Sequence, residues 1–422
     1  MATFFIFLFF AQSVPIFEER IAAEHAARLK TDDRILFYQK IVTTNPKNVH
    51  YKIWLAGAYV QKMRETTDFT YINRAAGLLD TVLSADPGNY EALRLQAMVQ
   101  LEYHQFSKAV ESSQALIGMK PGDPWNYGIL GDAFIEIGDY EKAADAFQKM
   151  ADIRPDLSSY NRAAHYHFLN NDVKGAIDLM KRAVSAGSSA PENVAWCLVE
   201  LGHIYMKTGQ LDEAENAYRS ALRYFPASHS ALAGLGKVQA MKGELPEAIE
   251  SYRHAQSITP LPDYASALFD LYSAQGRKKD AEQQMQTLDM IDKMMQVNHE
   301  KVNRNLALIY ADHDRRLDRA LQLAQAELGS RRDVYTYDAL AWALYKSKRF
   351  DEAAQASEKA LKLNTPEPSF YYHAGMIAAA LGKIPEAQKD LERALALNPK
   401  FDILQARLAG ERLGELTRAS TE

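Results

Sequence analysis

The most regular feature of the sequence is a pair of short apolar patterns that returns with turn residues between the copies. Between Pro124 and Leu157, apolar residues recur at helical spacing on either side of Gly138. Glycine readily adopts the left-handed conformation that ends a helix. Pro155 ends the second stretch, because proline clashes with the preceding turn and donates no hydrogen bond. The pattern therefore predicts two helices joined by a turn in each unit.

The units form a ladder marked by one alanine in the second helix. Successive ladder alanines are 33 to 39 residues apart, a period typical of solenoid proteins. The ten positions are Ala75, Ala109, Ala143, Ala176, Ala214, Ala248, Ala281, Ala320, Ala353 and Ala387. Prolines follow the same period at Pro87, Pro121, Pro155, Pro226, Pro260 and Pro399. An array of stacked helix pairs is predicted along nearly the whole chain.

Small residues of the first helices are expected to face the ladder alanines. Gly131, Gly202, Gly236 and Gly375 occupy the corresponding positions of four units. A glycine inside a helix is ~0.5–1 kcal/mol less favourable than alanine, so close helix packing must compensate for it.

These residues resemble the tetratricopeptide repeat. The best matching segments are LGDAFIEIGDYEKAADAFQKMADIRP, LGHIYMKTGQLDEAENAYRSALRYFP, LGKVQAMKGELPEAIESYRHAQSITP and AGMIAAALGKIPEAQKDLERALALNP. The resemblance covers about residues 34–417. It implies an all-α fold: a right-handed α-solenoid of about ten helix-turn-helix repeats, with partial capping helices at both ends.

Departures from the period suggest how the chain is organised. We expect an apolar segment (1–14), an N-terminal repeat subarray (15–186), an insert loop (187–194), a C-terminal subarray (195–401), and a capping helix with its tail (402–422). A lengthened turn is expected over 64–71, an extended helix over 280–296, and the capping helix itself over 403–416. The four methionines near the extended helix, Met285, Met290, Met294 and Met295, are expected to pack against a neighbour.

The apolar N-terminal segment suggests export. The run from Phe4 to Ala11 has the length of a signal-peptide core and is too short to span a bilayer. No lysine or arginine precedes it, which leaves an apolar strap on the first helix as the alternative. We expect an exported, periplasmic or secreted protein, with a cytoplasmic location as the alternative, and no transmembrane span.

Composition and motifs point away from catalysis. The chain has 49 basic and 54 acidic residues, whereas nucleic-acid-binding proteins usually carry a basic excess. Cys197 is the only cysteine, which excludes an internal disulfide. No phosphate-binding loop, zinc-protease motif or nucleophile elbow occurs. We therefore expect no enzyme activity, no cofactor and no metal site.

The resemblance also implies a binding surface, because the first helices of this family line a concave groove. The groove residues carried over are Trp125, Ile135, Phe168, Trp196, His203, Met206, Lys237, Met241, Arg304, Tyr335, Asp338, Trp342, Tyr345, Tyr372 and Met376. Aromatic residues and methionine are enriched at binding hot spots. The alternative is that several of these side chains only fill the inner wall.

Three functions remain open at this point. The first is a protein–protein interaction scaffold that binds an extended peptide or a partner helix in the groove. The second is a non-catalytic subunit or adaptor of an enzyme or an export or assembly complex. The third, less favoured, is nucleic-acid binding through residues 301–349, whose basic excess is small. The partner's identity and homo-oligomerisation stay open.

Overall fold

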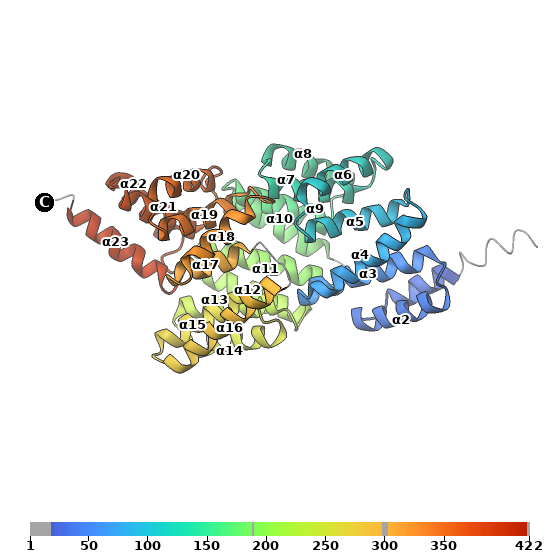
Figure 1. Ribbon diagram of the computed structural model, residues 1–422, viewed down its shortest axis with the longest axis horizontal. Helices are drawn as coiled ribbons and strands as arrows, with labels where there is room; N and C mark the ends of the chain where they lie inside the picture. Colours follow the sequence, from blue (N-terminus) through green and yellow to red (C-terminus); the bar gives the residue numbers. More distant parts are fainter. Residues whose placement is uncertain (1–17, 188–189, 298–302, 420–422) are drawn as a thin grey trace, which may run out of the picture. The chain divides into compact units, whose positions relative to one another are not determined.

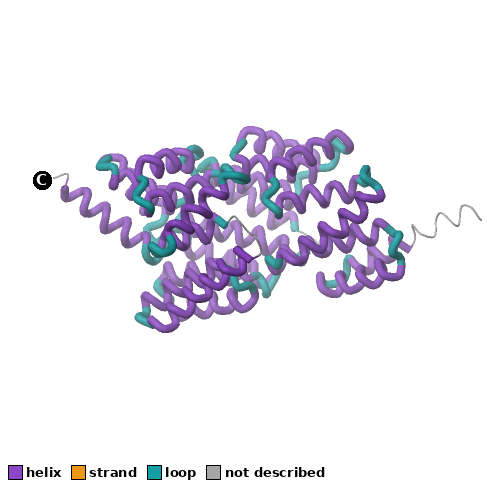
Figure 2. The backbone as a smooth tube through the Cα atoms, in the orientation of Figure 1, coloured by secondary structure: helices purple, strands orange, loops and turns teal. Residues whose placement is uncertain are grey.

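The computed structural model describes residues 18–187, 190–297 and 303–419. Within these ranges the chain consists of helices and connecting loops, with no strand (Figures 1 and 2). The expected α-helical fold is therefore confirmed. The predicted signal segment over residues 1–14 lies outside the described residues. The chain divides into two compact units, Met1–Tyr103 and His104–Glu422.

The first unit consists of consecutive helices joined by short connections. Residues 18–26 are helical, and α2 (Thr31–Thr44), α3 (Val49–Thr66), α4 (Phe69–Ala85) and α5 (Tyr90–Glu102) follow. The turn expected to be lengthened over 64–71 is short instead. Helix α3 continues to Thr66, and α4 begins at Phe69 after Asp68, whose carboxylate caps the helix by accepting from the Thr70 amide. The additional residues extend the two helices.

The second unit contains the helix pairs in which the repeat is clearest. Its helices are α6 (Phe106–Met119), α7 (Pro124–Ile137), α8 (Tyr140–Ile153), α9 (Leu157–Leu169), α10 (Val173–Ala186), α11 (Pro191–Lys207), α12 (Leu211–Tyr224), α13 (His229–Lys242) and α14 (Leu245–Ile258). They continue as α15 (Pro262–Ala274), α16 (Lys278–Val297), α17 (Arg304–Asp312), α18 (Leu317–Glu327), α19 (Val334–Lys346), α20 (Phe350–Ala360), α21 (Pro368–Ala380), α22 (Ile384–Leu397) and α23 (Gln405–Ala419).

The ladder alanines lie in the helix interfaces, as the period predicts. None of the ten is more than 5% exposed. The glycines opposite them do not face the alanine itself in most pairs but the large residue four positions later. A Cβ added at Gly202 would lie 2.6 Å from the ring of Tyr218, which follows Ala214. Only glycine permits this approach, since real side-chain atoms do not come so close.

Of three predicted segments, one differs from the structure and two are found. Helix α11 begins at Pro191, so the second half of the expected insert loop is helical. The extended helix and the capping helix exist, as α16 and α23. The methionines of α16 divide into two pairs: Met285 and Met295 are buried, whereas Met290 and Met294 are exposed on the same helix. Packing against a neighbour therefore holds for only half of them.

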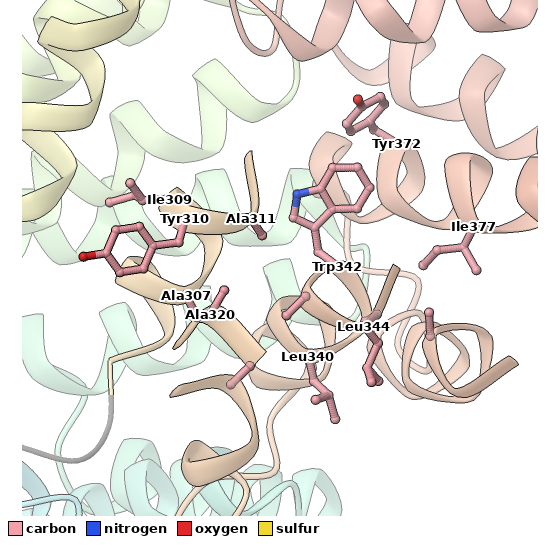
Figure 3. Packing of buried hydrophobic residues seen from close by; sticks show 14 of the residues in the cluster. Ala307, Ile309, Tyr310, Ala311, Ala320, Leu340, Trp342, Leu344, Tyr372 and Ile377 are labelled. Carbon is pink, nitrogen blue, oxygen red and sulfur yellow. The ribbon is translucent and has the colours of Figure 1, made fainter. Parts of the chain in front are cut away.

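The largest hydrophobic cluster of the described residues extends from α15 to α23, and Figure 3 shows the part of it around α17 and α19. Trp342 of α19 lies at its centre, with Tyr372 of α21 tilted against the indole at a ring distance of 5.5 Å. Tyr345 stacks on the same indole at 4.8 Å. Aromatic side chains thus fill the space between successive first helices.

The second unit also closes on itself, which the repeat pattern did not predict. The turn after α7 meets the loop before α19. The amide of Arg332 donates to the carbonyl of Glu136 at 2.8 Å, and the amide of Val334 donates to the Tyr140 hydroxyl at 2.9 Å. Arg331 also lies 2.8 Å from a carboxylate oxygen of Glu136.

The next two turns repeat this arrangement. The hydroxyl of Thr365, before α21, donates to the carbonyl of Leu169 at the end of α9, at 2.7 Å. The side-chain amide of Asn398, after α22, donates to the carbonyl of Met206 near the end of α11, also at 2.7 Å. Both acceptors are helix-terminal carbonyls, which lack a partner within their own helix. Three consecutive turns therefore hold three consecutive loops, and we call these contacts the closure.

Among the described residues, no helix combines the length and the apolar character that crossing a bilayer requires.

Candidate binding cavity

The inner side of the second unit contains a cavity of about 550 Å³. Its walls come mainly from the first helices α11, α13, α15, α17 and α21, which are the helices expected to line a groove. The segment Asn398–Gln405, between α22 and α23, covers one side. The volume lies within the range of small-ligand sites, roughly 300–1,000 Å³. The first helices thus line a hollow that this segment borders on one side.

The charges of the cavity are mainly negative. Three acids have close nitrogen partners: Glu367 lies 2.6 Å from Lys207, Asp270 lies 2.9 Å from His313, and Asp338 lies 2.9 Å from Nδ1 of His373. The other charged lining residues are Asp263, Asp312, Asp402 and Lys237. This set contains three carboxylates and one lysine, so the cavity favours a positively charged occupant.

Asp312, at the end of α17, is held by two donors. The indole nitrogen of Trp342 and the side-chain amide of Gln405 each donate to its Oδ1 at 2.7 Å. Burial raises the pKa of Asp312 to about 6, with His373 lowering it and Asp402 raising it. The carboxylate therefore lies at the junction of α17, α19 and the covering segment.

Asp402 caps the start of α23 from within the covering segment. Its Oδ1 accepts from the amides of Leu404 at 2.8 Å and Gln405 at 2.9 Å. In both Asp312 and Asp402, Oδ1 thus accepts two hydrogen bonds. The second oxygen, Oδ2, has no hydrogen bond from the described residues.

His373 of α21 packs against the indole of Trp342. Its ring stacks on Trp342 at 4.2 Å and an interplanar angle of 16°, and its Nδ1 is 2.9 Å from Asp338. A carboxylate can only accept, so Nδ1 carries the hydrogen, and Nε2 presents a lone pair when the ring is neutral. His373 lines the cavity and is 2% exposed, and Nε2 has no hydrogen-bond partner in the described chain.

The predicted groove residues lie in four different environments. The cavity is lined by His203, Met206, Lys237, Met241 and Asp338. The hydrophobic interior holds Ile135, Phe168, Trp342 and Tyr372 as buried side chains, and Met376 and Tyr345 are half-buried against it. Trp196 is the outlier, because 39% of its surface is exposed. The structure therefore brings only part of the predicted set to one site.

The remaining predicted residues are engaged in contacts within the chain. Arg304 pairs with Asp333 at 3.0 Å and lies over the Tyr335 ring at 5.4 Å. Lys207 lies over the same ring at 5.3 Å. Trp125 is half-buried, with the guanidinium of Arg162 5.8 Å from its ring.

Sequence reasoning did not select Asp263, Asp312, His373 or Asp402 as site residues. Asp402 belongs to a segment expected to be a terminal cap, and Asp312 is one of several acids among basic residues. Nothing in the period shows that the chain returns across its own inner face. The signal that could have identified Asp263 and Asp312 is the excess of acids at first-helix positions of successive repeats.

Comparisons with known proteins agree with the helix-pair architecture. Residues 130–191, 199–265 and 339–400 match the family model described as tetratricopeptide repeat. Superkiller protein 3 of Schizosaccharomyces pombe is 25% identical over 177 residues, 40% of this chain and 13% of that protein. Anaphase-promoting complex subunit 7 of Arabidopsis thaliana is 24% identical over 220 residues, 50% of this chain and 36% of that protein. The chain thus spans less than two-fifths of the length of either relative.

Two solved structures align with about half of the chain. A thermophilic tetratricopeptide-repeat protein of Thermus thermophilus aligns with 46% of this chain and 100% of its own, at 20% identity and a TM-score of 0.40. The type IV pilus biogenesis factor PilW aligns with 53% of this chain and 98% of its own, at 15% identity and a TM-score of 0.43.

Proposed function

Because the chain is a tetratricopeptide-repeat protein, we propose that it is a non-catalytic scaffold that receives a segment of a partner protein in its inner cavity. Proteins of this family generally mediate protein–protein contacts and serve as scaffolds or subunits of complexes. The observation that carries the proposal is the cavity itself. It lies on the first helices, and five of the predicted groove residues line it.

Charge pairing argues against the nucleic-acid alternative. In the described part of residues 301–349, Arg304 pairs with Asp333, Arg331 with Glu136, Lys346 with Asp314, and Arg316 and Arg319 with Asp292. Basic groups that are already neutralised release few counterions from a phosphate backbone. This pairing supports a protein partner over a nucleic acid.

Blocking the cavity tests the proposal. Ala267 lines it and is replaced by tryptophan to fill the space, and Ala227→Trp, at an exposed turn outside the cavity, is the matched control. Tagged forms of the full chain are expressed in its own organism, and captured proteins are quantified by mass spectrometry. We expect wild type and Ala227→Trp to retain partners that Ala267→Trp loses, with similar melting curves for all three.

Two other results are informative. Equal capture by all three forms would contradict binding in the cavity. Stoichiometric capture of an enzyme or of export components by wild type would favour the adaptor alternative, in which the scaffold holds a catalytic partner.

A further inference from the structure

Three hydrogen-bond acceptors without described partners belong to residues that line the cavity: Oδ2 of Asp312, Oδ2 of Asp402 and Nε2 of His373. We propose that these groups bind the guanidinium of an arginine side chain, presented by the partner segment that enters the cavity. The inference rests on the proposed function and specifies the chemistry that the cavity recognises.

The three groups are linked through short contacts. Asp312 accepts from the Trp342 indole at 2.7 Å, and His373 stacks on that indole at 4.2 Å. Gln405 joins Asp312 to the covering segment at 2.7 Å, and Asp402 lies three positions before it. The acceptors are therefore fixed by packing and hydrogen bonds before any ligand arrives, which reduces the entropy lost on binding.

The character of the acceptors selects a donor. Ionised carboxylates only accept hydrogen bonds. With Nδ1–H of His373 directed at Asp338, Nε2 is also an acceptor while the ring is neutral. An anion or a carbonyl group would find no donor among these three. A ligand with several N–H groups satisfies all of them.

The charge of the cavity also favours a cationic ligand. Asp263, Asp312 and Asp402 share the cavity with Lys237, while Glu367 is paired with Lys207 and Asp270 with His313. The lining therefore holds more negative charge than its own bases neutralise. Because these carboxylates line a cavity, water and salt screen their charge less than they would on an open surface. A bound cation is therefore stabilised.

A metal ion fits the arrangement less well than an organic cation. Within the described residues, no three His, Cys, Asp or Glu side chains are close enough together to hold a metal. A guanidinium is planar, presents five N–H donors in a fork, and packs on aromatic rings, one of which, Phe401, lines the cavity.

The depth of the cavity explains why the site admits an extended side chain. Asp263 and Asn305 are exposed at the cavity wall, so this side is open to solvent. Asp312 and His373 are contributed from deeper, as a half-buried and a buried residue. An arginine side chain is long enough to carry its charge inward while its backbone remains outside.

The test uses the full chain and the peptide acetyl-Gly-Gly-Arg-Gly-Gly-amide as probe, measured by isothermal titration calorimetry at low salt. The same peptide with citrulline in place of arginine has nearly the same shape without the charge. We expect the arginine peptide to bind at least about tenfold more tightly, a difference of about 1.4 kcal/mol. Equal affinity of the two peptides for the wild-type protein would overturn the proposal without any variant.

The double variant Asp312→Asn with Asp402→Asn removes both charges. Asparagine retains an Oδ1 that can accept the same donors, so the local structure is preserved. We expect the preference for arginine over citrulline to disappear in this variant. Asp145→Asn, an exposed acid of α8, should leave the preference unchanged. A preference that survives in the double variant would also overturn the assignment.

Two further measurements complete the test. The first asks whether the cation is a free small molecule or part of a peptide, and the second distinguishes this proposal from the proposed function. Free L-argininamide should bind at least about tenfold more weakly than the peptide; equal binding would show that the ligand is a small cation and overturn its presentation by a partner segment. If Ala267→Trp abolishes partner capture while the wild-type protein does not distinguish arginine from citrulline, the scaffold function stands and the guanidinium site fails.

Discussion

The backbone of Gly138 lies directly against that of Arg332, although the two residues belong to repeats far apart in the sequence. A Cβ added at Gly138 would be 2.6 Å from the carbonyl oxygen of Arg332. Gly138 also has a positive φ of 80°, which L side chains rarely adopt. This glycine is therefore required twice, once by the turn and once by the closure.

Replacing Gly138 by alanine should destabilise the second unit by more than backbone strain alone. Gly243 is the matched control, because its φ is 86° and a Cβ there would contact nothing within 4 Å. We expect Gly243→Ala to lose ~1 kcal/mol, and Gly138→Ala ~1–3 kcal/mol more, in urea unfolding. Hydrogen exchange should also rise at the Arg332 loop in Gly138→Ala alone. Equal losses for the two variants would contradict the closure.

The aromatic residues of α19 test whether the inner face binds or packs. Trp342 is 2% exposed, so Trp342→Ala with Tyr345→Ala should lower the free energy of unfolding by at least ~3–5 kcal/mol. Trp196, which is 39% exposed, is the control and should lose ~1 kcal/mol or less on replacement by alanine. Melting curves and partner capture are measured on the same samples. Retained stability with lost capture would instead support a direct role of Trp342 in binding.

Glycines inside helices should respond to alanine with opposite signs, according to what they face. Gly202→Ala places a methyl group 2.6 Å from Tyr218 and should destabilise by ~1–3 kcal/mol. Gly410 of α23 has nothing within 4 Å of an added Cβ, so Gly410→Ala should stabilise by ~0.5–1 kcal/mol. Thermal unfolding of the two variants decides the question, and a shift of the same sign in both would show that the close approach at Gly202 has little effect.

The pair His313–Asp270 should make stability depend on pH. Burial acts to lower the pKa of His313, but the hydrogen bond and charge of Asp270 outweigh it and raise that pKa to about 9. A histidine whose folded pKa is raised stabilises the fold fully below its ordinary value of 6.5, and this contribution is lost as pH rises through about 9. His313→Gln should therefore cost on the order of 1–3 kcal/mol at pH 6 and much less at pH 10.

Urea unfolding of wild type and His313→Gln at both pH values measures this difference. His254→Gln, at a residue for which no ion pair is described, should show the same loss at pH 6 and pH 10. A loss for His313→Gln that does not change with pH would contradict protonation of His313 in the folded state.

The helix pairs could be predicted because their determinants are local. Ala143 and Pro155 act within one repeat: the first permits two helices to approach, and the second ends a helix. The period of the sequence therefore fixes each pair. The limits of α11 were less accessible, because Pro191 begins a helix within a segment whose composition is typical of a loop.

The closure and the acid site could not be predicted in this way. The distance between Tyr140 and Val334 depends on the sum of small rotations between many repeats, none of which is encoded in a single motif. Asp402 becomes a cavity residue only because that sum returns the chain to α17. The same geometry buries Trp342 and Tyr372, which the repeat register alone places on an open inner surface.

The closure also limits how this array can change its length. Solenoids usually gain or lose repeats by tandem duplication, because each unit needs only its two neighbours. Here Thr365 must meet Leu169, and Asn398 must meet Met206, across a fixed number of intervening units. Duplicating one repeat of about 34 residues between them would insert another helix pair, and each donor would then no longer lie beside its acceptor. The second unit therefore has a defined number of repeats, in the way that a closed β-propeller has a defined number of blades.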